Sequence, residues 1–171
     1  VLHTRDVVAV AAPAAPAAVA ASASPLTSSS SDANTKLTQF VNIFVGTEAN
    51  NDPGDVFAGA SVPYGMAKAT INVEGYAPAG YVWPSDQPTR GVSPLHDSGT
   101  GSSDGSYGNF CIMPVLCTDN TIDLCPTLLD PRKRLRRNGT DFGRPGYFTT
   151  TLDNGIKIEL TSTRTSTLEK Y

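Results

Sequence analysis

The chain has 171 residues, a formal net charge of −3 at pH 7 and a pI of about 5.2. This length suggests one domain of ordinary size, and the slight acidity gives no electrostatic case for binding nucleic acid. No apolar run reaches the roughly 18 residues of a transmembrane helix, so no membrane span is expected. Charged residues make up only 17% of the chain, whereas Gly and Pro are abundant, a mix that favours a turn-rich β domain.

The first 35 residues are dominated by Ala, Pro and Ser, and we expect them to lie outside the fold, which we place at residues 36–171. The apolar residues 7–12 and the small residues 21–23 resemble the remnant of a signal peptide. Because Pro13 and Pro16 interrupt this region, a disordered linker stays open as the alternative. The chain starts without Met and ends at Tyr171 inside an expected strand, so we expect a processed or truncated product.

Several segments are predicted to form strands. Residues 40–45 are strand-like in composition, residues 66–73 alternate, and residues 110–116 form the clearest apolar run, in which Pro114 indicates an edge or a bulge. The clearest hairpin joins residues 146–151 to 156–163 through Asn154-Gly155, because both turn residues tolerate positive φ. No stretch has a sustained helical period. We therefore predict an all-β fold, an antiparallel β-sandwich.

Three cysteines lie close together in the second half of the chain: Cys111, Cys117 and Cys125. A disulfide between Cys117 and Cys125 would close a short loop, whereas Cys111 and Cys117 would stand too far apart at the two ends of the expected strand. Three reduced thiols are an equally open interpretation. The spacing does not favour a zinc site.

Three other features carry alternative interpretations. Trp83, the sole tryptophan, lies among prolines, where it either stacks on a sugar or packs on the protein. The basic run 132–137 is a solvated loop, a processing site or an anion patch. Asn138-Gly139-Thr140 is a sequon that predicts N-glycosylation at Asn138 if the protein is secreted.

A glycine-rich stretch, residues 90–109, carries the only histidine outside the leader, His96. A serine-nucleophile motif around Ser103 is rejected, because no helix and no later histidine accompany it. His96 is either a hydrogen-bonding group for a ligand or a brace bonded to backbone. Four carboxylates could supply a glycosidase acid pair, but nothing in the sequence fixes their separation: Glu74, Asp86, Asp97 and Asp104.

A series of sequence blocks occurs in one order along the chain: residues 41–47 (Val-Asn-Ile-Phe-Val-Gly-Thr), 57–66 (Phe-Ala-Gly-Ala-Ser-Val-Pro-Tyr-Gly-Met), 91–101 (Gly-Val-Ser-Pro-Leu-His-Asp-Ser-Gly-Thr-Gly), 108–110, and 145–148 with 155–161. Together they resemble the N-terminal domain of glycoside hydrolase family 92, the calcium-dependent exo-acting α-mannosidases. The His-Asp-Ser-Gly-Thr-Gly form resembles fungal members. The resemblance covers about residues 37–171.

The resemblance implies a β-sandwich that packs on a larger helical (α/α) toroid, with the active site between the two domains. Such enzymes invert the anomeric centre and remove terminal mannose from N-glycans or mannan, and calcium binds the vicinal hydroxyls of the sugar. The acid and base carboxylates and most calcium ligands belong to the toroid, which this chain lacks. We therefore expect no catalytic residue, metal ligand or cofactor in this chain alone. The family's pocket loop maps onto His96, Asp97, Ser98, Gly99, Thr100 and Gly101.

The sequence also departs from the family pattern. Pro94 and Leu95 replace a more usual His-Met or His-Thr, and residues 118–138 have no recognised counterpart. We expect a substrate-binding domain of an exo-α-mannosidase in glycoprotein catabolism, inactive alone, whose partners are mannose-containing glycans and the missing toroid. A freestanding carbohydrate-binding module and a non-functional relic are the alternatives. Secretion is the expected location, with a cytosolic fragment as the alternative.

Overall fold

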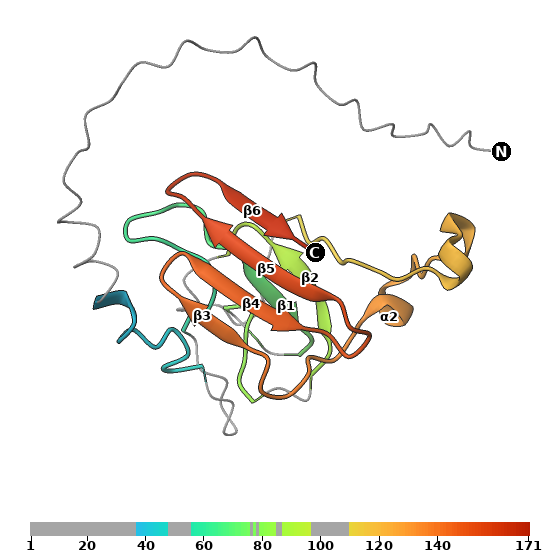
Figure 1. Cartoon of the computed structure of the whole chain (residues 1–171), viewed down its shortest axis with the longest axis horizontal. Helices are drawn as coiled ribbons and strands as arrows, with labels where there is room; N and C mark the ends of the chain where they lie inside the picture. Colours follow the sequence, from blue (N-terminus) through green and yellow to red (C-terminus); the bar gives the residue numbers. More distant parts are fainter. Residues whose placement is uncertain (1–36, 48–55, 76, 78, 85–86, 97–109) are drawn as a thin grey trace, which may run out of the picture.

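The computed structural model of the chain describes residues 37–47, 56–75, 77, 79–84, 87–96 and 110–171. Its strands form two antiparallel sheets (Figure 1). The first pairs β1 (Thr70–Val73) with β2 (Thr89–Ser93). The second has the order β3-β4-β5-β6 and consists of β3 (Phe142–Arg144), β4 (Tyr147–Thr151), β5 (Lys157–Ser162) and β6 (Thr167–Lys170).

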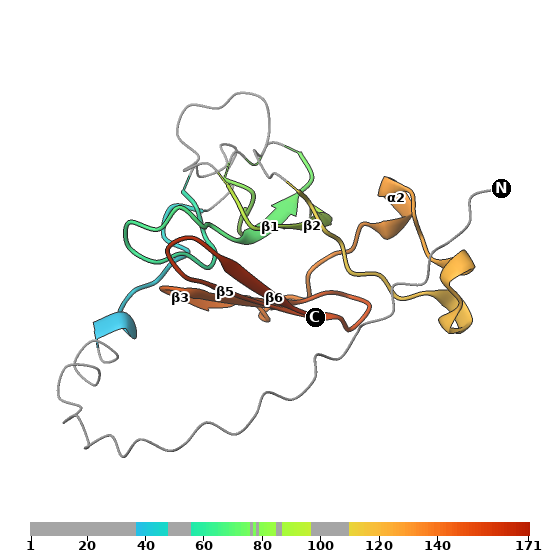
Figure 2. The same cartoon turned by 90° about the horizontal axis from the view of Figure 1, so that it is seen from above.

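The two sheets form the layers of a sandwich. Figure 2 shows β1 and β2 lying over one face of the larger sheet. One apolar cluster fills the space between the layers, and its largest side chains include Ile71, Tyr81, Phe148, Ile158 and Leu160. Burial of apolar area at about 25 cal/mol per Å² makes this cluster the main source of stability. The predicted all-β antiparallel sandwich is confirmed.

The predicted hairpin is present as β4 and β5. The side chains of Ile158 and Leu160 are fully buried, as their alternation with polar residues predicts. The turn itself differs from the expected type, because Gly155 has a φ of +92° while Asn154 is not among the residues with positive φ. The Asn154 side chain instead accepts a hydrogen bond from the Ile156 amide at 3.2 Å. The turn therefore needs only one left-handed residue.

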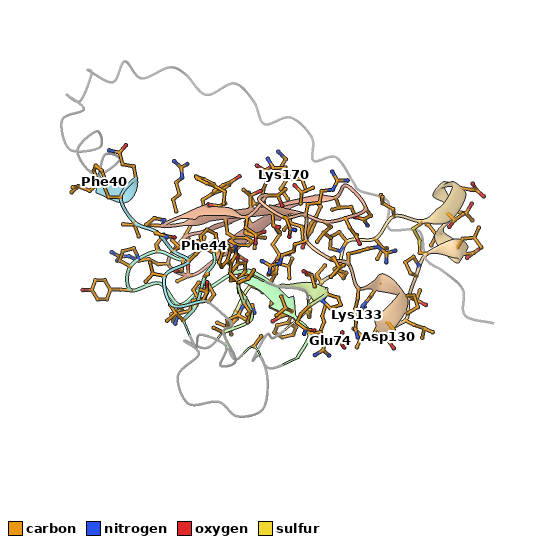
Figure 3. The ribbon with its side chains drawn as sticks, turned by 90° about the horizontal axis from the view of Figure 1, so that it is seen from below. Phe40, Phe44, Glu74, Asp130, Lys133 and Lys170 are labelled. Atoms are coloured by element: carbon orange, nitrogen blue, oxygen red, sulfur yellow. A yellow bond between two sulfur atoms is a disulfide. The ribbon has the colours of Figure 1, made fainter. Side chains whose placement is uncertain are left out.

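The strand expected at residues 40–45 is wrong. The carbonyl oxygen of the Asn42 side chain accepts the Phe44 amide proton at 2.9 Å, and the Thr47 amide donates to the Phe44 carbonyl at 3.2 Å. An asparagine that bonds its own backbone two residues on favours a turn over an extended ladder. The segment therefore folds as turns, which leave Phe40 79% exposed. Figure 3 shows Phe44 next to the sheets, where it packs against the core, and Phe40 at the outer end of the segment.

The strand expected at residues 110–116 is also wrong. Only Ile112 pairs, in an isolated bridge with Val92 on β2. Phe110 has a φ of +58°, which breaks an extended run before it starts, and Pro114 has no amide proton to donate. The expected strand at 66–73 is shorter than predicted and is limited to β1, preceded by the isolated bridge of Ala69 with Ala60.

A short-helix segment follows Ile112 and projects from the sandwich (Figures 1 and 2). It contains η1 (Thr118–Asn120), η2 (Ile122–Leu124) and α2 (Leu129–Arg132). A disulfide joins Cys117 to Cys125, the pairing that the short loop favoured, while Cys111 is a free, exposed thiol. Lys133 pairs with Glu74 and, at 2.6 Å, with Asp130, which ties α2 to the end of β1 (Figure 3).

The basic run 132–137 is not the solvated loop that composition favoured. Arg134 forms an isolated bridge with Thr89 of β2, and Arg136 forms another with Leu152 at the end of β4. The segment therefore connects the two sheets. The Arg136 side chain is 4% exposed, and its charge is paired inside the protein. Arg137 remains exposed.

Candidate functional site

A pocket of about 740 Å³ opens where the turn at residues 42–46 meets the segment that leads to β3. Its wall combines three aromatic residues, an amide and a carboxylate with Val45 and Gly46. The lining residues are Asn42, Phe44, Val45, Gly46, Tyr81, Trp83 and Asp141. Ligand sites are typically concave and partly apolar, with a few polar groups that fix orientation. This pocket, here called the Trp83 pocket, is the best-formed candidate site among the described residues.

Trp83 presents a large, half-exposed ring at this pocket. Its side chain is 46% exposed, and its backbone amide donates to the Thr47 carbonyl at 2.8 Å. The preceding carbonyl, that of Val82, accepts a hydrogen bond from Nη2 of Arg136 at 2.7 Å. Both hydrogen bonds hold the Val82–Trp83 peptide group, which anchors the backbone from which the exposed ring projects.

Asp141 is the acidic group of the pocket, and three donors surround it. The Tyr81 hydroxyl donates at 2.8 Å, Nη1 of Arg136 at 2.5 Å, and the Thr150 hydroxyl at 2.5 Å. The guanidinium of Arg136 also lies over the Tyr81 ring, 4.5 Å from its centroid. Three donors from three different segments thus fix the position of this carboxylate in the pocket wall.

Tyr81 contributes a rigid wall. Burial raises the pKa of its hydroxyl well above the ordinary range, with the Asp141 carboxylate acting in the same direction and Arg136 opposing it. The Tyr81 ring contacts Phe44, with centroids 5.3 Å apart, and Phe148, with centroids 5.8 Å apart. Tyr81 therefore stays a neutral hydrogen-bond donor and links the pocket to the core.

Asn42 supplies the amide of the pocket. Its Oδ1 atom is used by the Phe44 amide, which leaves its Nδ2 group as a donor at the pocket wall. An aromatic face, an amide donor and a carboxylate acceptor together suit a polyhydroxylated ring, whose C–H face stacks and whose hydroxyls both donate and accept.

His96 lies in the core and is 2% exposed. Its Nδ1 atom is 3.1 Å from the Lys68 carbonyl, and its Nε2 atom is 2.7 Å from Oδ1 of Asn72. The Nδ2 group of Asn72 donates to the Ser93 hydroxyl at 2.7 Å. These contacts tie His96 to Lys68 and to Asn72 of β1, and they favour the second of the two interpretations of this residue, a bracing histidine. Gly80 makes room for its ring, since a Cβ there would meet Nε2 at 2.7 Å.

The remaining sequence-predicted residues are distributed as follows. Asp97, Ser98, Gly99, Thr100 and Gly101 lie outside the described residues, as do the candidate carboxylates Asp86 and Asp104. Asn138 is exposed in the turn before β3 and borders a small hollow beside Trp83. Glu74 is paired with Lys133 and is not part of the Trp83 pocket.

Sequence reasoning missed the polar residues around Trp83. Tyr81 and Arg136 are 55 positions apart, and no local pattern links them to Asp141. Asn42 was the one accessible signal, because it lies in the first sequence block. The basic run concealed Arg136, since a charge run usually indicates a solvated face.

The described residues do not fit a calcium site. Calcium takes six to eight oxygen ligands, and no group of three or more acidic, His or Cys side chains that could hold a metal gathers within the described ranges. Asp141 already accepts three hydrogen bonds. No helix in the described part of the chain is long and apolar enough to cross a membrane.

Comparisons with known proteins identify relatives of this architecture. A curated "Uncharacterized secreted glycosidase" of Arthroderma benhamiae is 40% identical over 133 residues, which are 78% of this chain and 17% of that protein. A family GH92 α-mannosidase from Bacteroides thetaiotaomicron superposes with a TM-score of 0.58 at 26% identity and covers 78% of this chain and 18% of its own. An inverting GH92 mannosidase from the same organism shares the fold, with a TM-score of 0.54 at 21% identity over 74% of this chain and 16% of that one.

This chain thus spans less than a fifth of the length of each of these relatives. Residues 40–171 match the glycosyl hydrolase family 92 N-terminal domain, which is most of the chain and includes the turn, Trp83 and Asp141. The chain belongs to glycosyl hydrolase family 92, as a stretch of its N-terminal domain.

Proposed function

We propose that this chain is the sugar-binding N-terminal part of an inverting exo-α-mannosidase and that it does not hydrolyse glycosides alone. The observation that carries the proposal is the half-exposed Trp83 ring at a pocket with an amide and a carboxylate, in a family with solved α-mannosidases. Mannose-terminated glycans are the proposed ligands. The Arthroderma benhamiae relative, whose name describes a secreted glycosidase, supports a secreted location.

Each pocket residue has a proposed role. Trp83 stacks on the apolar face of the sugar, the Nδ2 group of Asn42 donates to a hydroxyl, and Asp141 accepts from one. The residues that follow the buried His96, namely Asp97, Ser98, Gly99, Thr100 and Gly101, are proposed as a second source of hydroxyl contacts. The Asn72–His96 hydrogen bond holds the residue that precedes them.

The same geometry supports the proposed inactivity. Glycoside hydrolysis needs two carboxyl groups with distinct roles, about 5–10 Å apart. Asp141 is the only carboxylate that lines the Trp83 pocket among the described residues, and one carboxylate cannot fill both roles. The second carboxylate, and any calcium that acts in the longer relatives, would therefore have to come from outside the described residues.

Titration calorimetry with methyl α-mannoside and a mannobiose tests the binding role. Loss of an aromatic contact worth about 0.5–1.5 kcal/mol predicts that Trp83→Ala weakens binding roughly two- to tenfold. Tyr64→Ala is the matched control, because Tyr64 is 99% exposed and does not line the Trp83 pocket. Equal affinity of the Trp83→Ala variant and the wild type would refute the pocket assignment.

A mannosidase assay of the purified chain with calcium tests the inactivity. We expect no turnover of a chromogenic α-mannoside, and restored turnover when a helical domain of a family 92 relative is supplied. Binding with no gain of activity under any such complementation favours the carbohydrate-binding module. Clear turnover by the chain alone contradicts the proposal.

A further inference from the structure

The sequon forms an ordered surface turn beside the Trp83 pocket. The Thr140 hydroxyl donates to the Arg137 carbonyl at 2.8 Å and accepts the Thr151 amide at 3.1 Å, which fixes the turn on β4. Asn138 is exposed and makes no hydrogen bond to any described residue. A Cβ placed on Gly139 would meet nothing within 4 Å. The turn therefore has open space at Gly139, next to the exposed side chain of Asn138.

Asn138 and Trp83 border the same small hollow. Its other walls include Pro84, Arg136, Gly139 and Asp141. Trp83 also lines the larger pocket, so this residue borders both the hollow and the proposed ligand site. Because Trp83 is 46% exposed and borders the hollow with Asn138, a group attached to Asn138 is within reach of it.

A sugar on Asn138 has a suitable surface to pack against. A pyranose presents an apolar C–H face to an aromatic ring, and the exposed Arg137 guanidinium, which donates to the Asp153 carbonyl at 3.2 Å, stands nearby as a polar neighbour. Because the sugar would be attached covalently, the contact is intramolecular and pays no cost of association. The attached N-acetylglucosamine can therefore stack on Trp83 even if the contact is too weak to bind the same sugar free in solution.

The Cys117–Cys125 disulfide independently points to an oxidising compartment, since disulfides persist in the secretory pathway and are rare in the cytosol. Asn138 is the only residue of the full sequence in an Asn-X-Ser/Thr sequon. We propose that Asn138 carries an N-linked glycan whose first N-acetylglucosamine packs on the exposed face of Trp83 and completes the wall of the pocket. This inference does not depend on mannose binding or on catalysis.

Attachment of the glycan is a glycosyl transfer that needs no oxidant or reductant. The donor is a lipid-linked oligosaccharide diphosphate of the secretory pathway. A bond forms between Nδ2 of Asn138 and C1 of the first sugar, while the bond from C1 to the diphosphate oxygen breaks. The amide loses one proton, and the lipid diphosphate is the leaving group. The glycan is added to the emerging chain, and the folded turn only has to accommodate it.

The test is expression of the chain through the secretory pathway of yeast, followed by peptide mass mapping of Asn138. Endoglycosidase H then trims the glycan to one N-acetylglucosamine. Because Trp83 is the sole tryptophan, iodide quenching of the intrinsic fluorescence reports on this ring alone. We expect quenching to fall roughly twofold relative to Asn138→Gln from the same host, because a stacked sugar covers one face of an aromatic ring.

A second measurement on the same preparation avoids dependence on the variant. Peptide N-glycosidase, applied to folded protein that endoglycosidase H has not trimmed, removes the whole glycan and converts Asn138 to Asp, and the matched control is the Asn138→Asp protein made in bacteria. We expect quenching to rise to the level of that control. An occupied Asn138 with unchanged quenching would overturn the packing, and an unmodified Asn138 in the secreted, folded chain would overturn the proposal as a whole.

Discussion

The guanidinium of Arg136 lies over the ring of Tyr81, with its central carbon 4.5 Å from the ring centroid. Both side chains also donate to the same carboxylate, that of Asp141. The three groups form a closed triangle behind Trp83, and Arg136 extends it to the Val82 carbonyl. A buried ion pair therefore supports the peptide group that precedes Trp83.

Asp141→Ala removes the anion from this triangle. Breaking a buried pair leaves an uncompensated charge and costs about 3–5 kcal/mol, so we expect a loss of this size in urea denaturation monitored by circular dichroism. Asp130→Ala is the control, because Asp130 pairs with Lys133 while its side chain is 86% exposed. Its effect should be much smaller. Equal effects of the two substitutions would show that the buried pair has no special role.

The triangle also shows what the sequence could and could not predict. The β4–β5 hairpin was predictable because its alternation and its turn are local. The failures at residues 40–45 and 110–116 came from a side-chain bond at Asn42 and a positive φ at Phe110, which composition does not report. The pocket wall joins segments more than 50 positions apart, so the family blocks indicated a ligand site whose polar residues only the fold could assemble.

Gly80→Ala should displace the buried ring of His96. A Cβ at Gly80 would stand 2.7 Å from both Nε2 of His96 and the Ile71 carbonyl, at a φ of +87°. Gly139→Ala is a matched control, since its φ is +74° with nothing within 4 Å. In both variants the alanine has a left-handed backbone conformation, which lowers the free energy of unfolding by about 1–2 kcal/mol. Only Gly80→Ala also introduces a steric clash. We expect Gly80→Ala to lose clearly more stability and to shift the His96 ring resonances in NMR spectra, whereas equal losses would argue against the brace.

The stability of the larger sheet should depend on pH through the carboxyl group of Glu159. Hydrogen bonds from Lys157, then Tyr147 and Lys170, lower the pKa of its carboxyl to about 2. A lowered folded-state pKa means that its stabilisation is fully present above the unfolded value of about 4.5 and is lost as the pH falls towards 2. The stability difference between wild type and Glu159→Gln should therefore shrink from pH 5 to pH 2 in urea denaturation. A difference that stays constant over this range would contradict the assignment.

High salt provides a check on the same cluster. The Lys157 and Lys170 side chains that hold Glu159 are largely exposed, so their interactions should be screened. We expect 1 M sodium chloride to reduce the difference between wild type and Glu159→Gln at pH 7. Tyr147→Phe keeps both lysines but removes one donor, and it should raise the pKa of Glu159 in a carboxyl-carbon NMR titration.

The Cys117–Cys125 disulfide should stabilise its own loop and not the sandwich. The two cysteines are eight positions apart, and a disulfide across such a loop stabilises the folded state by about 2–3 kcal/mol, because it restricts the unfolded chain. Inside the loop, η2 has no buried residue, and Ile122 is 82% exposed. The loop therefore has little apolar burial to keep it folded once the ring is opened. In the Cys117→Ser/Cys125→Ser variant we expect rapid amide exchange and protease cleavage at residues 118–124, with unchanged exchange in β4 and β5. Cys111→Ser keeps the disulfide and is the control, and a loss of protection across the β4–β5 hairpin in the double variant would show that the loop supports the core.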